Sequence, residues 1–149
     1  MVLESSRFWT LRAHLTAEAM AMTRAELPSQ GLSPTALAYL GDAVYELFVR
    51  EQFLFPPSRI KTYHRRVVAQ VRAEQQARHL TALRSQLTAA EDDIVRRGRN
   101  AAPKRPGRSD PQAYQQATGF EALIGYLYLN DPQRLLELLN HLDFTAPTP

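Results

Sequence analysis

The sequence predicts an all-α protein. Helical periodicity recurs along the chain, and no segment has the strict alternation of apolar and polar residues that indicates a half-buried strand. Proline and glycine residues separate the periodic segments, as expected for connections between helices. The 149 residues, 44% of them hydrophobic and 22% charged, are enough for one domain with a substantial core. We therefore expect five to seven helices.

In the first half of the chain, three helices are expected. The first covers about 5–26 and has mixed periodicity. The second begins after Ser33, a residue type that caps helices, with Pro34 at the first helical position. It should end near Phe53, because two prolines follow shortly after it. Apolar residues recur at helical spacing over 58–83, and we expect one long amphipathic helix there.

Helices also account for most of the second half. Thr88 and Glu91 have the spacing of a capping box, so a helix should begin there and end at Gly98. Residues 98–111 contain three prolines and two glycines and are expected to form a loop. A strong helix should follow from about 111 to 131, with a short one directly after it.

The domain organisation expected is a helical extension over 1–30, a globular catalytic domain over 31–143 and a disordered tail over 144–149. The chain has no cysteine, which excludes disulfides, thiolate metal sites and a cysteine nucleophile. No secretory signal and no run of about 18 apolar residues is present, so no membrane partner is expected.

Positive charge is concentrated in the middle of the chain. Residues 57–108 carry 13 Lys and Arg against four acids, a balance of +9, whereas the remainder has a balance of −6. Such a segment suits a polyanion, because each phosphate that it neutralises releases counterions. The alternative is an ordinary solvated basic face.

Two acids lie in apolar helical segments. Between 36 and 49 the polar side chains are Asp42, Glu46 and two tyrosines, and Glu121 lies in a second apolar stripe. No Lys or Arg stands one helical turn from Asp42 or Glu121. Burial of such a carboxylate is unfavourable unless it is protonated or paired with a cation. If the two helices pack together, Mg²⁺ or Mn²⁺ would relieve the repulsion. The alternative for either acid is a structural hydrogen-bond anchor, and Glu46 fits that role best.

Two longer motifs carry a family resemblance. "LAYLGDAVYE" and "ATGFEALIGYLYLN" resemble the two signature motifs of the ribonuclease III endonuclease domain, in the same order. The resemblance covers about 32–142. It implies an all-α homodimer that cleaves double-stranded RNA with Mg²⁺, for which Mn²⁺ can substitute. No segment after 143 resembles a double-stranded RNA-binding domain, as in the minimal branch, Mini-ribonuclease III. That branch implies a bacterial cytoplasmic enzyme (a plastid one is possible) that matures the ends of 23S ribosomal RNA precursor, with no small-molecule substrate.

The resemblance also implies roles for individual residues. Asp42 and Glu121 match the metal-binding, catalytic acids of the two motifs. Two further acidic positions of the family are occupied here by Ala38 and Thr118, and an additional acid at the start of the first motif is Thr35. With fewer charges, the site should hold Mg²⁺ more weakly and depend on RNA phosphates to complete its shell. Hydrolysis by water would leave 5′-phosphate and 3′-hydroxyl ends.

Without an appended RNA-binding domain, the catalytic domain itself must bind the duplex. The residues expected to do so lie mainly in the proline-containing basic segment 96–108, and they are Lys61, His64, Arg65, Arg96, Arg97, Arg99, Asn100, Lys104, Arg105 and Arg108. The dimer interface is expected on the first-motif helix, which is apolar around its circumference, through Leu37, Leu40 and Val44. The competing interpretations are a catalytically degenerate RNA-binding dimer of the same fold and a helical protein–protein adaptor.

Overall fold

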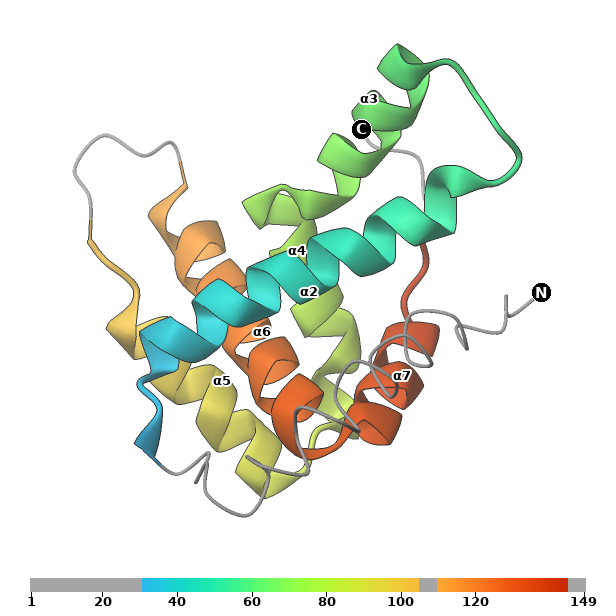
Figure 1. Ribbon diagram of the computed structural model, residues 1–149. Helices are drawn as coiled ribbons and strands as arrows, with labels where there is room; N and C mark the ends of the chain where they lie inside the picture. The colour runs from blue at the N-terminus through green and yellow to red at the C-terminus, as the bar shows by residue number, and fades with distance from the viewer. Residues whose placement is uncertain (1–30, 105–109, 145–149) are drawn as a thin grey trace. The chain divides into compact units, whose positions relative to one another are not determined.

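In the computed structural model, residues 31–104 and 110–144 are described, and they form helices joined by short connections (Figure 1). The all-α prediction is confirmed for this part of the chain. The predicted helix over 5–26 and residues 145–149 lie outside it. The helices are α2 (Pro34–Leu54), α3 (Ile60–Val71), α4 (Ala73–Leu83), α5 (Ala89–Ala101), α6 (Pro111–Asn130) and α7 (Pro132–Asn140), with a 3₁₀ turn over Arg84–Gln86.

Helix α6 forms the centre of the core, and α2, α4 and α5 pack around it (Figure 1). An apolar helix without a polar face must be covered on all sides. Phe120 of α6 contacts Tyr45 of α2 edge-to-face, with ring centroids 5.2 Å apart. Ten residues of α6 are buried. This central position accounts for the apolar composition of the helix.

Two glycines allow α2 and α6 to touch backbone to backbone. A Cβ added to Gly41 would overlap the carbonyl oxygen of Glu121 and lie 2.8 Å from the Gly125 nitrogen. A Cβ added to Gly125 would in turn overlap the Leu37 carbonyl group. Real Cβ atoms are not found this close to backbone, so the crossing requires glycine at both positions. The contact places Asp42, the next residue after Gly41, beside Glu121.

The α5–α6 contact depends on glycine as well, and it corrects one prediction. Gly98 does not end α5, because the helix continues to Ala101. A Cβ at Gly98 would lie 2.7 Å from the Ala122 Cβ, and one at Gly119 would lie 2.7 Å from the Val95 carbonyl oxygen. Gly98 therefore allows α5 and α6 to pack closely. From the sequence alone, a glycine with this role cannot be told from a glycine that ends a helix.

The single helix predicted over 58–83 is two helices, α3 and α4, and the first begins after Arg59 rather than at Ser58. Arg72 between them is extended, with ψ of 148°. Val67 and Gln76 are both buried, although residues nine apart point in roughly opposite directions in a straight helix. The break changes the phase so that both halves face the core, and amphipathic periodicity alone does not reveal it.

Three other predicted start signals are confirmed. Ser33 Oγ accepts a hydrogen bond from the Ala36 amide at 3.1 Å, and Thr88 and Glu91 form the capping box that opens α5. Helix α6 begins at Pro111, as expected, and is capped by Asp110. These caps act within one turn of the chain, which explains why they could be recognised from sequence.

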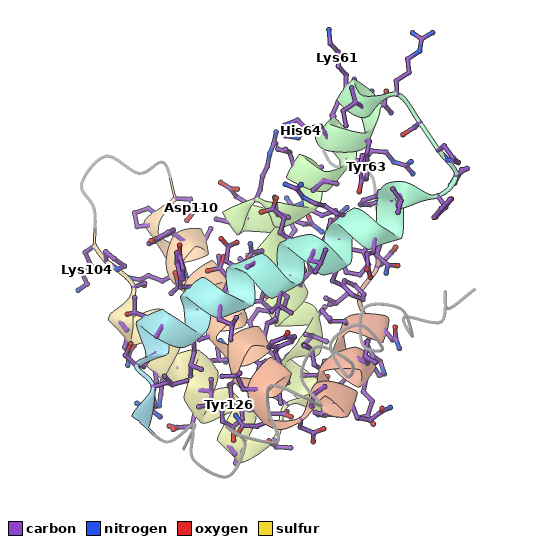
Figure 2. The ribbon with its side chains drawn as sticks, in the orientation of Figure 1. Lys61, Tyr63, His64, Lys104, Asp110 and Tyr126 are labelled. Carbon is purple, nitrogen blue, oxygen red and sulfur yellow. The ribbon has the colours of Figure 1, made fainter. Side chains whose placement is uncertain are left out.

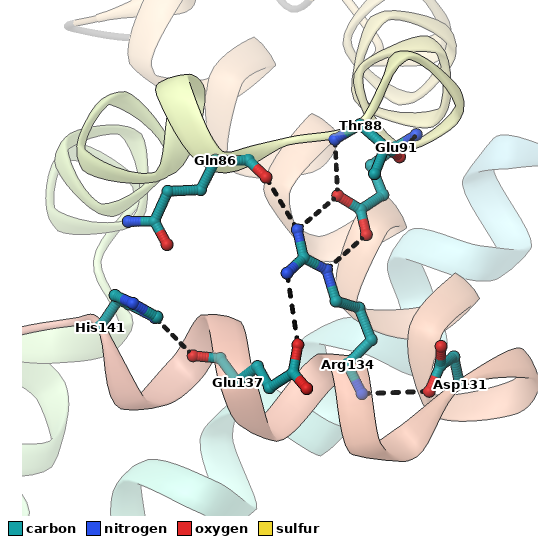
Figure 3. A network of polar contacts seen from close by, with 7 residues as sticks. All are labelled: Gln86, Thr88, Glu91, Asp131, Arg134, Glu137 and His141. Carbon is teal, nitrogen blue, oxygen red and sulfur yellow. Dashed lines mark hydrogen bonds and ion pairs between the residues drawn. The ribbon is translucent and has the colours of Figure 1, made fainter.

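A buried ion pair ties α7 to the start of α5 (Figure 3). Arg134 donates from Nε to Glu91 Oε1 at 2.8 Å and from Nη2 to Glu91 Oε2 at 3.1 Å, and Nη2 also reaches the Gln86 carbonyl at 2.7 Å. The side chain of Glu91 is only 7% exposed, and its hydrogen bond from Arg134 is the main cause that lowers its pKa. Glu91 thus stays ionised while it caps one helix and holds another, since a bidentate arginine compensates for its burial.

Candidate active site

The structure brings Asp42 and Glu121 together at the crossing of α2 and α6. Asp42 lies on the exposed edge of α2, and Glu121 is half-buried on α6. The two carboxyl groups lie close enough together that each affects the pKa of the other. The two acids are 79 positions apart along the chain, and the contact between Gly41 and Gly125 brings them together. The geometry creates one site with two carboxyl groups that are open to solvent on the Asp42 side.

Both carboxyl groups have a raised pKa. Burial raises the pKa of Glu121 to about 8, and the nearby charge of Asp42 acts in the same direction. The pKa of Asp42 is also raised, first by burial and then by the charge of Glu46. Among the residues that the structure describes, no cation contributes to either shift, and the nearby Arg50 is paired with Glu46. The pair therefore carries less than two negative charges near neutral pH until a cation joins it.

Ala38 and Thr118 occupy the two positions where the family resemblance implies further acids. They lie one helical turn before Asp42 and Glu121, and neither side chain offers a metal ligand. Ala38 is buried against Ala122. Thr118 is buried, and its hydroxyl donates to the Tyr114 carbonyl of its own helix at 3.0 Å. Neither side chain can replace a carboxylate at this site.

Gln76 is an additional site residue that the sequence did not single out. It is buried at the start of α4, and it acts to lower the pKa of Glu121. Its Oε1 atom is buried with no hydrogen-bond partner. A glutamine within an apolar helical stripe was the available signal, but it is weak, because polar residues on such stripes are often solvated.

These residues fit a hard divalent cation. Within 31–104 and 110–144, no cluster of three or more His, Cys, Asp or Glu residues has the arrangement of a metal site. Mg²⁺, however, is often held by one or two carboxylates together with water and substrate phosphates. Asp42 and Glu121 supply two carboxylates that repel each other, and neither has an ion pair with a Lys or Arg of the described residues. Their oxygen donors suit Mg²⁺ or Mn²⁺ rather than Zn²⁺.

The two histidines of this region take no part in the carboxyl pair. His79 is buried between aromatic rings, at 5.3 Å from the Phe144 ring centroid and 6.3 Å from that of Tyr45. Burial lowers the pKa of His79 to about 4, so the imidazole is neutral at physiological pH. His64 is exposed on α3.

The predicted RNA-binding residues lie on two separate surfaces (Figure 2). Lys61, His64 and Arg65 are exposed on α3, and Lys61 and His64 project from the part of that helix farthest from the core. Lys104 lies on the opposite side in the same view, beside Asp110. A short RNA duplex that contacts the α3 residues would therefore not also reach Lys104.

The second surface is the end of α5 and the segment after it. Arg96, Arg97, Asn100 and Lys104 are exposed there, and Arg99 is half-buried. Arg96 forms an ion pair with Asp93, and this pair reduces the net positive charge of the surface. The remaining two residues of the prediction, Arg105 and Arg108, lie outside the described residues.

An open groove of about 520 Å³ runs between α4 and the first turns of α6. Its lining is mainly polar and includes Arg78, Arg84, Gln112 and Gln116. Arg84 is held by Asp92 at 2.9 Å. The lining also includes the acids Glu74 and Asp110, so the groove carries charges of both signs.

The three residues expected at a dimer interface differ in exposure. Leu37 and Val44 are buried in the core of the chain itself, and only Leu40 reaches the surface in part. The exposed side of α2 carries a different apolar stripe at helical spacing, formed by Ala36, Tyr39, Leu40, Ala43 and Leu47. Tyr39 is 86% exposed. Any contact that α2 makes with a partner must use this stripe rather than Leu37 or Val44.

Residues 35–132 match the Ribonuclease III domain family. The matched stretch contains α2 and α6 and therefore both acids of the site. The chain belongs to the ribonuclease III family, the class that its all-α fold and paired acids define. No helix among the described residues has both the length and the apolar character needed to cross a bilayer.

Its relatives place it more narrowly. A Mini-ribonuclease 3 of Synechocystis sp. is 60% identical over 120 residues, which is 80% of this chain and 84% of that protein. That of Thermosynechococcus vestitus is 58% identical, covering 78% and 77%. A crystal structure of a Fusobacterium nucleatum protein superposes with a TM-score of 0.68 at 31% identity, covering 74% and 90%. The resemblance to the minimal branch, Mini-ribonuclease III, is confirmed, and with it the expectation of an endoribonuclease of this family.

The raised pKa of Glu121 predicts a pH-dependent stability in the absence of divalent metal. The folded protein keeps the Glu121 proton up to about pH 8, whereas the unfolded chain releases it near the ordinary value of 4.5. Glu121 therefore favours folding below pH 4.5, and this contribution is lost as pH rises through 8. Glu121→Gln, which cannot ionise, should gain up to roughly 5 kcal/mol of stability relative to wild type over this window.

Urea unfolding in EDTA at pH 5, 7 and 8.5 measures this difference. Glu74→Gln, at an exposed position on α4, is the control and should follow wild type. Stability curves for Glu121→Gln and wild type that stay parallel from pH 5 to 8.5 would contradict the assignment.

Proposed function

We propose that this chain is a divalent-metal-dependent endoribonuclease that cleaves double-stranded RNA. The observation that carries the proposal is the Asp42–Glu121 pair, two acids held side by side with no cation of the described residues among the causes of their pKa shifts. A structural carboxylate elsewhere in the same protein, Glu91, is compensated by Arg134. The contrast supports a functional reason for the uncompensated pair.

The residues of the site have separate tasks in this mechanism. Asp42 and Glu121 would hold Mg²⁺ or Mn²⁺, which supplies activation of water and stabilisation of charge on the scissile phosphate and the leaving 3′ oxygen. Glu121 must lose its proton when the site is loaded, because its pKa lies near 8. Asp42, on the more exposed side, orients the site toward the RNA backbone. Water as nucleophile would leave 5′-phosphate and 3′-hydroxyl ends.

Binding of the duplex would come from the two basic surfaces. Side chains read the deep major groove of A-form RNA poorly, so backbone and 2′-hydroxyl contacts should dominate. Arg97 and Lys104 are exposed, and no ion pair to either is found among the described residues. The α3 surface, with Lys61 and Arg65, would contact the same duplex farther along its axis, since the two surfaces are widely separated.

The active form would be a homodimer formed through the apolar stripe of α2. A tyrosine with 86% of its surface exposed, flanked along the helix by Leu40, Ala43 and Leu47, is unusual on the surface of a monomer. A twofold axis through this stripe would present two sites to the two strands of one duplex. The stripe adjoins Asp42 on the same helix, so dimerisation and catalysis share one element.

The cellular substrate would be the large-subunit (23S) ribosomal RNA precursor in the bacterial cytoplasm, as the resemblance to the minimal branch implies. The relatives come from bacteria, which supports this location. A catalytically inactive RNA-binding dimer is the second candidate, favoured by the neutral residues Ala38 and Thr118.

Cleavage of duplex RNA by wild type and Asp42→Asn tests the proposal. Wild type should cut long double-stranded RNA in Mg²⁺ and not in EDTA. Asp42→Asn should lose at least about 100-fold in rate, because one ligand and its charge are removed. Glu137→Gln, at an exposed position on α7, is the control and should stay within a few-fold of wild type.

Each other outcome has a definite meaning. Wild-type binding without cleavage favours the inactive RNA-binding dimer, and neither binding nor cleavage favours a protein adaptor. A transcript carrying the paired ends of the ribosomal precursor should be cut faster than a random duplex of equal length. Equal rates would contradict the ribosomal substrate.

The salt dependence of RNA binding tests the basic surfaces. Arg97→Ala with Lys104→Ala should lower the slope of log K against log[salt] by about 0.7–0.9 for each RNA phosphate that the variant no longer neutralises. Arg50→Ala, at an exposed arginine already neutralised by Glu46, should leave the slope unchanged. A double variant with the wild-type slope would exclude this surface from RNA binding.

Sedimentation velocity tests the dimer. The wild-type chain of 16.9 kDa should sediment as a dimer at micromolar concentration, and Tyr39→Arg should sediment as a monomer, because it places a charge in the apolar stripe. Asn140→Arg, at an exposed position on α7, should remain dimeric. A monomeric wild type would rule the proposal out.

A further inference from the structure

The connection between α2 and α3 exposes apolar side chains that the core does not cover. Leu54 ends α2, Phe55 follows it, and Ile60 begins α3. Their exposed fractions are 48%, 61% and 74%. Pro56 and Pro57 prevent the helix from continuing, and Figure 1 shows the connection at the outer edge of the helices. We call these three apolar side chains the α2–α3 corner.

Two contacts between α2 and α3 hold the two ends of the corner in place. The Tyr63 hydroxyl donates a hydrogen bond to the Arg50 carbonyl oxygen at 2.7 Å. The guanidinium carbon of Arg66 lies 4.8 Å from the centroid of the Phe53 ring, a cation–π distance. Both contacts join the first turns of α3 to the last turns of α2. The corner is therefore ordered before any ligand binds, which lowers the entropy lost on binding.

Positive charge surrounds the corner without a compensating acid. The segment 52–73 contains no Asp or Glu, and its cations are Arg59, Lys61, Arg65, Arg66 and Arg72. All of these cations are exposed. Within 31–104 and 110–144, none of them forms an ion pair. The partner that complements this surface is therefore a polyanion.

The apolar side chains narrow the class of polyanion. Paired phosphates alone would need only the cations, whereas unpaired bases stack on aromatic rings and are attracted by a basic groove at the same time. A membrane of anionic lipids would instead require an apolar face along a helix. The exposed apolar side chains stand at a turn, and the buried residues of α3, Val67 and Gln70, face the core. Unpaired RNA fits this combination best.

We propose that the α2–α3 corner binds unpaired nucleotides that adjoin the duplex, with the Phe55 ring stacked on a base and Arg59 and Lys61 at neighbouring phosphates. The inference rests on the proposed function, because it adds a single-stranded segment to the double-stranded RNA substrate. Leu54 lies about 18 Å beyond Asp42 along the axis of α2. The preferred substrate is thus a junction of paired and unpaired RNA, with its unpaired part away from the scissile bond.

Binding of two kinds of RNA in EDTA, followed by fluorescence anisotropy, tests the proposal. One is a blunt duplex, and the other is the same duplex with a short single-stranded extension, at the 5′ end in one series and at the 3′ end in another. Wild type should bind an extended RNA more tightly than the blunt one. Phe55→Ala should weaken binding of that RNA about fivefold or more, because base stacking is lost, and leave the blunt duplex within about twofold.

Two further variants separate stacking from general apolar contact. Phe55→Leu keeps an apolar side chain and removes the ring, so it should show the same loss as Phe55→Ala. Leu32→Ala, at an exposed apolar residue just before α2, is the control and should follow wild type with both kinds of RNA. Wild-type affinity of Phe55→Leu for the extended RNA would overturn the proposal, and so would equal affinities of wild type for the blunt and both extended RNAs.

Other occupants of the corner would give different results. If Phe55→Ala sediments as a monomer where wild type is a dimer, the corner is a contact between two copies and the proposal is overturned. Wild-type binding to vesicles of phosphatidylglycerol and phosphatidylcholine that Phe55→Ala loses would assign the corner to a membrane surface instead. The proposed function is judged separately by cleavage in Mg²⁺. A wild type that prefers the extended RNA but cuts no duplex would support the corner and refute the nuclease.

Discussion

The backbone contact between α2 and α6 is the constraint on which the rest of the structure depends. Gly41 lies against the Glu121 carbonyl group and Gly125 against that of Leu37, so the helix axes approach as closely as backbones allow. Side chains at either crossing point would force the helices apart. Because Asp42 follows Gly41 directly, the same contact that closes the core also assembles the carboxyl pair. Stability and function therefore share one packing interaction.

The protein treats its buried acids in two opposite ways. Glu91 receives two hydrogen bonds from Arg134, and its pKa is lowered, so this carboxylate is a structural link between α5 and α7. Glu121 has no ion pair with a cation of the described residues, and burial and Asp42 raise its pKa to about 8. An unpaired buried acid is unfavourable, and a bound cation would relieve that unfavourable state. The electrostatic contrast separates a fold-stabilising carboxylate from the one that we propose as a metal ligand.

Local signals predicted much of the helical framework. The caps at Ser33 and Thr88 and the start at Pro111 depend on atoms within one turn, and all three are confirmed. The break at Arg72 and the continuation of α5 through Gly98 were predicted wrongly. Both features depend on what the helix packs against. The break lets Gln76 of α4 face the core, and the missing side chain of Gly98 leaves room for Ala122 of α6. Neither partner is encoded in the spacing of the segment itself.

The sequence by itself determined the helical class, the caps, the family and the identity of the two acids, because these follow from residue type and short-range spacing. Tertiary structure alone decided that the two acids lie side by side, that the pKa of Glu121 is raised, and that Leu37 and Val44 lie inside the chain while Tyr39 is exposed. Hydrogen bonds and burial across helices depend on the depth and angle of their crossing. Those quantities are set by side-chain volume at distant positions, above all by the missing side chains of Gly41 and Gly125.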